Sequence, residues 1–205
     1  MPLLLLDNLL HAADFPQAVD GLAHRFRDRH GLPPVYQLGL VTPEVEPAAG
    51  ALEDRGIGPF FVAQGTPVLW RERGQERPMR GKMGLAEHQS FELELLEPGE
   101  GSDFYRQSLD PEGKTVIQHL GFLVPDVDEW AARLTAAGLP VWVRGKLKMG
   151  PVTVDFAYMD TMAEAGLVIE FISWHILGRP FQPPAAFFHS AGRLEKWSGK
   201  RSITV

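Results

Sequence analysis

The sequence contains an internal repeat, and this repeat limits the fold more than any other feature. Residues 37–45 read QLGLVTPEV and residues 119–127 read HLGFLVPDV. In both copies an Ala-rich segment follows and ends in a glycine, Gly56 in the first copy and Gly138 in the second, without a gap in the alignment. We therefore expect two copies of one supersecondary unit to pack around a shared core.

Each copy predicts one strand, one helix and three further strands. The opening strand is apolar, a Pro-acid pair suits the first turn of a helix, and the glycine suits its end. The further strands are expected at 59–63, 67–72 and 89–96 in the first copy, with 79–85 as a connecting strand or loop, and at 140–148, 151–159 and 166–172 in the second. We predict an α+β fold of paired βαβββ modules.

The chain then divides into a repeated domain and two extensions. The domain is expected at 35–173, with modules at 35–98 and 116–173 and a linker at 97–115 that is rich in glycine, proline and charge; the extensions are 1–34, helical around 16–29, and 174–205, with an apolar segment and a basic tail. We interpret both extensions as packing or dimer elements.

Composition excludes several function classes. The net charge of −6 makes a nucleic-acid partner unexpected, because such proteins usually carry a basic surface. No stretch approaches the roughly 18 apolar residues of a membrane span, and the N-terminus lacks the basic region of a signal peptide, so we expect a cytoplasmic protein. The chain has no cysteine, so any metal must be held by histidine, carboxylate or amide oxygen.

Strand alternation places four polar residues in equivalent positions of the two copies. Gln37 and His119 face away from the helices, and in each strand the residue two positions later is glycine, which marks close approach within a sheet. Glu170 is the only charge in an apolar strand, and Glu94 occupies the matching position of the first copy, with Glu92 as its competitor. A buried carboxylate needs a partner or a cation.

A pseudo-twofold arrangement of the copies would bring these four residues together. Gln37, Glu94, His119 and Glu170 offer one amide oxygen, one imidazole and two carboxylates. That set suits one divalent ion, Zn, Ni, Co, Mn or Mg, with an open position for a small-molecule substrate.

The chain resembles the vicinal oxygen chelate superfamily, which includes glyoxalase I, methylmalonyl-CoA epimerase, extradiol dioxygenases and bleomycin-resistance proteins. The resemblance rests on QLGLVTPEV, ELELLEP, QHLGFLVPDV and GLVIEFIS and covers about 35–173. It implies a half-open barrel around the metal, a homodimer, and Gln37, Glu94, His119 and Glu170 as the ligands. Glu170 would be the catalytic base, with Glu94 as its partner.

The resemblance leaves three functions open. The segment around the linker is similar to the epimerase branch, which implies proton transfer next to a carbonyl, with an acyl thioester as one substrate class. The Gln-Glu-His-Glu set is similar to the zinc glyoxalase I group, for which Arg80, Arg106 and Arg144 are candidate glutathione contacts. A non-catalytic binding protein of the bleomycin-resistance kind is the third. An extradiol dioxygenase is disfavoured, because iron oxygenases favour two histidines and one carboxylate.

Overall fold

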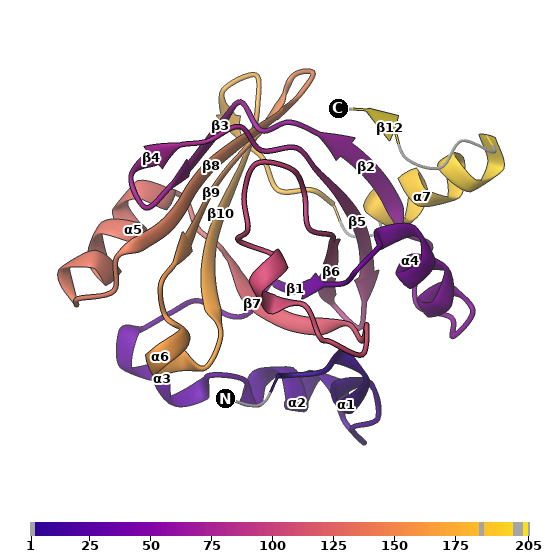
Figure 1. Cartoon of the computed structure of the whole chain (residues 1–205), viewed down its shortest axis with the longest axis horizontal. Coiled ribbons are helices and arrows are strands. Elements are labelled where there is room, and N and C mark those ends of the chain that lie inside the picture. The colour runs from indigo at the N-terminus through magenta and orange to yellow at the C-terminus, as the bar shows by residue number, and fades with distance from the viewer. Residues whose placement is uncertain (1–2, 185–186, 199–202, 205) are drawn as a thin grey trace.

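A computed structural model describes residues 3–184, 187–198 and 203–204, and its main feature is one curled mixed sheet (Figure 1). The strands lie in the order β12-β2-β5-β6-β1-β7-β10-β9-β8-β3-β4, and β11 pairs with β10. Their bounds are β1 (Gln37–Val41), β2 (Phe61–Gly65), β3 (Leu69–Glu72), β4 (Gln75–Glu76), β5 (Gly81–His88), β6 (Phe91–Leu96), β7 (Val116–Leu123), β8 (Val141–Met149), β9 (Val152–Met159), β10 (Val168–Ile176), β11 (Arg179–Pro180) and β12 (Ile203–Thr204).

The two repeats form two equivalent halves of this sheet. In the first half, β1 pairs in parallel with β6, which continues antiparallel to β5 and β2. In the second half, β7 pairs in parallel with β10, which continues antiparallel to β9 and β8. The halves meet where β1 and β7 pair antiparallel. This is the half-open barrel of paired modules that the sequence predicted.

Two of the predicted strands have other roles than expected. The segment 67–72 was predicted as a strand of the first module, but β3 pairs with β8 of the second. The segment 79–85, expected as a connecting strand or loop, contains most of β5, a full strand of the first half. Two glycines weaken its strand signal; at Gly84 a Cβ would lie 3.0 Å from Val45 Cγ1, a tight contact.

The helices cover the convex side of the sheet and enclose the larger core. They are α1 (Leu6–Leu10), α2 (Phe15–Gly21), α3 (His24–His30), α4 (Val45–Glu53), α5 (Val127–Ala136), α6 (Met162–Ala165) and α7 (Phe187–Ser198). Apolar residues of α1 to α5 pack with Leu38, Leu40, Leu120 and Phe122 of β1 and β7. The helix expected around 16–29 is two helices, because Ala23 adopts a left-handed conformation, φ 50°, between them.

The linker crosses the concave side of the sheet and places aromatic residues there. Phe104 is fully buried, with its ring centroid 4.8 Å from that of Tyr158 and 6.0 Å from that of Trp70. The short 3-10 helix η1 (Arg106–Ser108) follows before the chain enters β7. The concave side therefore has its own aromatic core, separate from the one under the helices.

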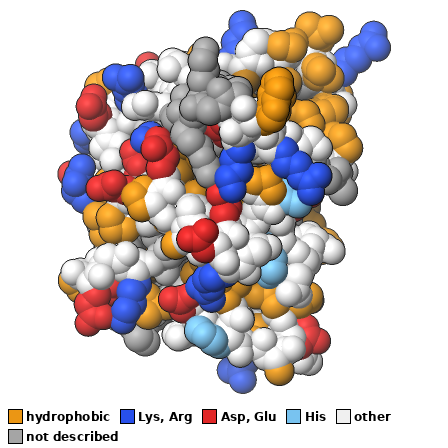
Figure 2. Space-filling model, turned by 90° about the vertical axis from the view of Figure 1, so that its right-hand side faces the viewer, with side chains coloured by type: hydrophobic (Ala, Val, Ile, Leu, Met, Phe, Trp, Pro, Cys, Tyr) orange, Lys and Arg blue, Asp and Glu red, His pale blue; other side chains and the backbone are white. Residues whose placement is uncertain are grey.

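The C-terminal segment packs against β2 and β5, the outer strands of the first half. Helix α7 contacts β2, where Glu195 accepts a hydrogen bond from the backbone N–H of Val62 at 2.8 Å, and Lys196 pairs with Glu53 of α4 at 2.7 Å. Figure 2 views this face, on which acidic, basic and hydrophobic side chains are interspersed. The predicted basic tail continues into 199–201, outside the described residues. No helix in the described ranges is long and apolar enough to cross a membrane.

Candidate metal centre and its cavity

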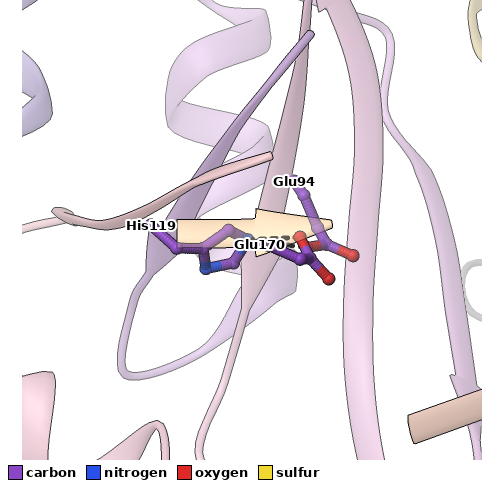
Figure 3. Close-up of side chains that lie close together, drawn as sticks. All are labelled: Glu94, His119 and Glu170. Atoms are coloured by element: carbon purple, nitrogen blue, oxygen red, sulfur yellow. Dashed lines mark ion pairs between the residues drawn. The ribbon is translucent and has the colours of Figure 1, made fainter. Parts of the chain in front are cut away.

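Three of the four predicted ligands form a tight cluster on the concave side. Glu94 of β6, His119 of β7 and Glu170 of β10 point toward one another (Figure 3). His119 Nε2 lies 3.1 Å from Glu170 Oε2 and 3.4 Å from Glu94 Oε2. One ligand atom from each residue lies within 4.8 Å of the others, close enough to share a metal ion.

The strand register explains why these side chains converge. Across the central pair of strands, Gly39 lies opposite His119, and Gly121 lies opposite Gln37. Within the halves, Gly39 lies beside Glu94 and Gly121 beside Glu170. Each glycine is therefore flanked by a carboxylate of its own half and by the amide or imidazole of the other half.

The glycines provide the space that the side chains of the other half occupy. A Cβ at Gly39 would lie 1.8 Å from Cε1 of His119, and a Cβ at Gly121 would lie 2.7 Å from Oε1 of Gln37. Real side chains never approach that closely, so neither position tolerates a larger residue without moving its neighbour. The close approach expected from glycine within a strand is made by a side chain of the opposite module.

Gln37, the fourth predicted ligand, is oriented by a carboxylate. Its Nε2 donates a hydrogen bond to Glu92 Oε1 at 2.6 Å, and the hydroxyl of Tyr36 donates to Glu92 Oε2 at 3.0 Å. With its nitrogen fixed in this way, the amide turns its oxygen away from Glu92. Gln37, Glu94 and Glu170 line the same cavity.

The electron-pair donors of all four predicted ligands make no well-formed hydrogen bond among the described residues, although His119 Nε2 lies within ion-pair distance of both carboxylates. These atoms are Gln37 Oε1, Glu94 Oε2, His119 Nε2 and Glu170 Oε2, and all are buried. Buried polar atoms without partners are costly, and a cation would satisfy all four. The other ring nitrogen, Nδ1 of His119, donates to Gln118 Oε1 at 2.7 Å, which leaves Nε2 free to bind an ion. This donor set fits a divalent metal.

The cluster perturbs the ionisation of its own groups. Burial lowers the pKa of His119, but the charges and hydrogen bonds of Glu170 and Glu94 outweigh it and raise the pKa to about 9. Burial, with a contribution from Glu94, raises the pKa of Glu170 to about 7 despite the opposing charge of His119. Burial and the charge of Glu94 raise the pKa of Glu92 to about 8. When no cation is bound, the carboxyl groups of Glu92, Glu94 and Glu170 therefore lie close together, with His119 as the basic group of the cluster.

A cavity opens from the cluster and is walled mainly by apolar side chains. Its free volume is about 80 Å³, and residues of both halves line it. Tyr105 and Tyr158 line it with their hydroxyl oxygens 3.0 Å apart. Burial raises the pKa of both tyrosines well above 10, so both hydroxyls stay protonated and can donate.

Other charged residues singled out in the sequence lie away from this cavity. Arg144 pairs with Asp128 at 2.8 Å, Arg106 pairs with Asp103 at 3.2 Å, and Arg80 does not line the cavity. The three arginines considered as glutathione contacts therefore do not reach the cluster through this cavity.

Several residues of the site carried no clear sequence signal. Glu92 was only a competitor of Glu94, although alternation puts both on one face, and its position opposite Gln37 in the sheet explains why both are used. Trp70 and Trp174 line the cavity from β3 and from the end of β10. Neither has a counterpart in the repeat, so no sequence pattern linked them to the ligands.

The chain was compared with known families and proteins. The family model described as Glyoxalase/Bleomycin resistance protein/Dioxygenase superfamily matches residues 36–158, more than half of the chain. No curated protein sequence matches.

Solved structures with a similar fold share little sequence with the chain. Methylmalonyl-CoA epimerase from Mycobacterium tuberculosis is 16% identical, with a TM-score of 0.44 over 67% of this chain and 85% of the epimerase. A variant of the Streptomyces coelicolor epimerase in complex with 2-nitronate-propionyl-CoA is 17% identical, with a TM-score of 0.46 over 69% and 96%. A mutant of 4-hydroxymandelate synthase from Streptomyces coelicolor is 13% identical, with a TM-score of 0.47 over 80% and 56%.

Proposed function

The chain belongs to the Glyoxalase/Bleomycin resistance protein/Dioxygenase superfamily, and from this premise we propose that it is a metal-dependent isomerase or epimerase. It would move a proton at a carbon next to a carbonyl group, with acyl thioesters as one substrate class. One observation carries the proposal: Gln37, Glu94, His119 and Glu170 each bury a donor atom that makes no well-formed hydrogen bond among the described residues, and three of these residues bring ligand atoms within 4.8 Å of one another. Three of the four, Gln37, Glu94 and Glu170, line the same cavity.

Gln37, Glu94, His119 and Glu170 would hold the ion. When bound, it would supply positive charge that stabilises negative charge developing on the carbonyl oxygen. Glu170 is the proposed base, because its carboxylate is buried and lines the cavity. It would take the proton from the carbon and return it to the opposite face or to the neighbouring carbon, with Glu94 as its partner. The apolar wall would exclude water from this transfer.

The metal content of the purified protein tests the site directly. We expect about one divalent ion per chain by elemental analysis after reconstitution, and a loss of most of it in His119→Ala. His24→Ala is the matched control, because that side chain is 64% exposed on α3. No metal in the reconstituted wild type would remove this proposal and favour the third hypothesis, a binding protein.

Isotope exchange tests the base. Acyl thioesters and α-hydroxy ketones are incubated with the metal-loaded protein in D₂O, and deuterium at the carbon next to the carbonyl is followed by NMR. We expect exchange with the wild type and with Glu112→Gln, a control at an exposed site. Glu170→Gln should lower the exchange rate at least a hundredfold, because a positioned base contributes roughly 10²–10⁴-fold to the rate. Exchange that survives in Glu170→Gln would exclude Glu170 as the base.

A glyoxalase I activity is the alternative that Gln37 favours. It requires recognition of glutathione, whose carboxylates usually pair with cations, and Arg80, Arg106 and Arg144 do not line the cavity. Turnover of the hemithioacetal of methylglyoxal and glutathione would establish this alternative, and its absence would exclude it. A homodimer is also proposed from the family, and its mass in solution tests it.

A further inference from the structure

The wall of the cavity is apolar and rich in aromatic and thioether side chains. Beyond the candidate ligands, the apolar lining residues include Trp70, Met83, Leu147, Phe156 and Trp174. Trp70 packs against Phe156 and Tyr158, with ring centroids 6.1 Å and 6.5 Å apart. Such a surface gains most by covering apolar parts of a ligand.

The charges around the cavity disfavour an anionic ligand. Lys82 is the only lysine or arginine among the described lining residues, whereas Glu92, Glu94, Glu97 and Glu170 contribute carboxyl groups. The ammonium of Lys82 is already paired with Glu46 of α4 at 3.0 Å. Even with a divalent ion in place, a second anionic group on a ligand would find no unpaired cation in the wall.

Two tryptophans give the wall specific hydrogen-bond donors. Trp70 and Trp174 are 4% and 7% exposed, and Nε1 of each is buried with no acceptor among the described residues. A buried indole N–H usually has a partner. Both side chains line the cavity, so a ligand there lies beside two indole rings whose N–H groups have no acceptor among the described residues.

From these observations we infer that the cavity takes an uncharged, largely apolar carbonyl compound with an aromatic or branched aliphatic body and oxygen acceptors, not a ligand with additional carboxylate or phosphate groups. This inference names the substrate class of the proposed isomerase and rests on that function. It places the carbonyl at the metal cluster and the apolar body against the wall of Trp70, Phe156 and Trp174.

Matched ligand pairs test the inference. The first pair is 4-methylbenzohydroxamic acid and 4-carboxybenzohydroxamic acid, titrated by calorimetry into the Zn²⁺-loaded protein, with acetohydroxamic acid as the small reference. The second pair is 4-methylacetophenone and 4-acetylbenzoate, titrated into the metal-free protein. Within each pair the only difference is a methyl group in place of a carboxylate.

We expect the methyl member of each pair to bind at least tenfold tighter than the carboxylate, and 4-methylbenzohydroxamic acid to bind at least tenfold tighter than acetohydroxamic acid. Equal or tighter binding of the carboxylates, or no binding by any aromatic probe, would overturn the inference. The metal-free pair separates the two proposals: a preference for the methyl member without metal or isotope exchange would retain the ligand class and remove the isomerase.

Two sets of variants locate the effect in the cavity. Leu147→Lys introduces a cation into the wall and should improve binding of the carboxylates relative to the methyl compounds, whereas Leu177→Lys, at a site 81% exposed, should change neither. Trp70→Phe should weaken 4-methylacetophenone about threefold or more, whereas Trp142→Phe removes an unpartnered N–H outside the cavity and should not. Equal effects of Leu147→Lys and Leu177→Lys, or of Trp70→Phe and Trp142→Phe, would contradict the placement of the ligand in this cavity.

Discussion

Gly39 and Gly121 leave the space that two of the predicted ligands, His119 and Gln37, occupy. Each is paired across the central strands with an amide or imidazole of the other half, and each leaves the space that this side chain fills. The residues thus work in reciprocal pairs, Gly39 with His119 and Gly121 with Gln37. The candidate metal site depends on the absence of a side chain at Gly39 and Gly121 as much as on the four predicted ligands.

Gly39→Ala should damage the site without unfolding the protein. The added methyl would meet the ring of His119 at 1.8 Å, so the ring must move, at a cost of about 1–3 kcal/mol. We expect metal affinity to fall at least tenfold in a titration against a chelating dye. Gly21→Ala is the control, because a Cβ there meets nothing within 4 Å. Unchanged affinity in Gly39→Ala would show that His119 does not bind the metal.

Glu92 should make the metal-free protein less stable as the pH rises. Its pKa is raised to about 8 in the folded protein from an ordinary value of 4.5, mainly by burial and then by Glu94. The folded state therefore holds this proton more tightly than the unfolded state, and stability is lost as the pH increases from about 4.5 through 8.

Glu92→Gln removes this ionisation and can still accept from Gln37. In the presence of a chelator, its unfolding free energy relative to the wild type should increase between pH 5 and 8, by up to a few kcal/mol. Urea unfolding at several pH values measures the difference, and the exposed Glu112→Gln should show none. A difference that does not vary with pH would mean that Glu92 ionises normally in the fold.

At the scale of elements, the repeat predicted most of the sheet but not its edges. The second module follows the pattern closely, and β7, Val116–Leu123, begins at the first residue of the predicted module. In the first module, the strand β5 was not clearly predicted because Gly81 and Gly84 reduce its strand propensity; a Cβ at Gly84 would crowd Val45 of α4. The pairing of β3 with β8 could not be read from sequence, because alternation specifies a face and not a neighbour.

Helix α7 packs against Trp174, which lines the cavity, and one of two adjacent phenylalanines makes this contact. Phe188 is 2% exposed and its ring lies 5.9 Å from that of Trp174, whereas Phe187 is 46% exposed. Phe188→Ala should cost about 3–5 kcal/mol and alter the tryptophan fluorescence spectrum, and Phe187→Ala should do neither. Thermal unfolding and emission spectra measure both effects. Equal costs would mean that α7 does not pack through Phe188.

Considered as a whole, the molecule places its candidate ligands on both sides of a pseudo-twofold junction. Gln37 and Glu94 come from the first half, and His119 and Glu170 from the second. The repeat made this pairing predictable. The aromatic wall of the cavity was not predictable, because β3, the linker and the end of β10 approach one another only in the folded chain.

Because both halves contribute ligands, metal binding should stabilise the entire fold. Free Zn²⁺ at 100 times its dissociation constant is expected to add about 2.7 kcal/mol, which corresponds to roughly 5–10 °C in Tm for a chain of this size. Thermal scans with Zn²⁺ and with chelator measure the shift. His119→Ala should lose it, and an equal shift in that variant would indicate that the ion binds elsewhere.

The pairing of β3 with β8 has a consequence for how the two halves can be separated. β3 and β4 are encoded between strands of the first half, yet they extend the edge of the second. A chain cut in the linker would yield two fragments. The first would carry β3 and β4 without β8, and the second would carry β8 without the two strands that extend its edge. The duplicated modules are consequently an interlocked pair, and only fragments expressed together would be expected to reassemble.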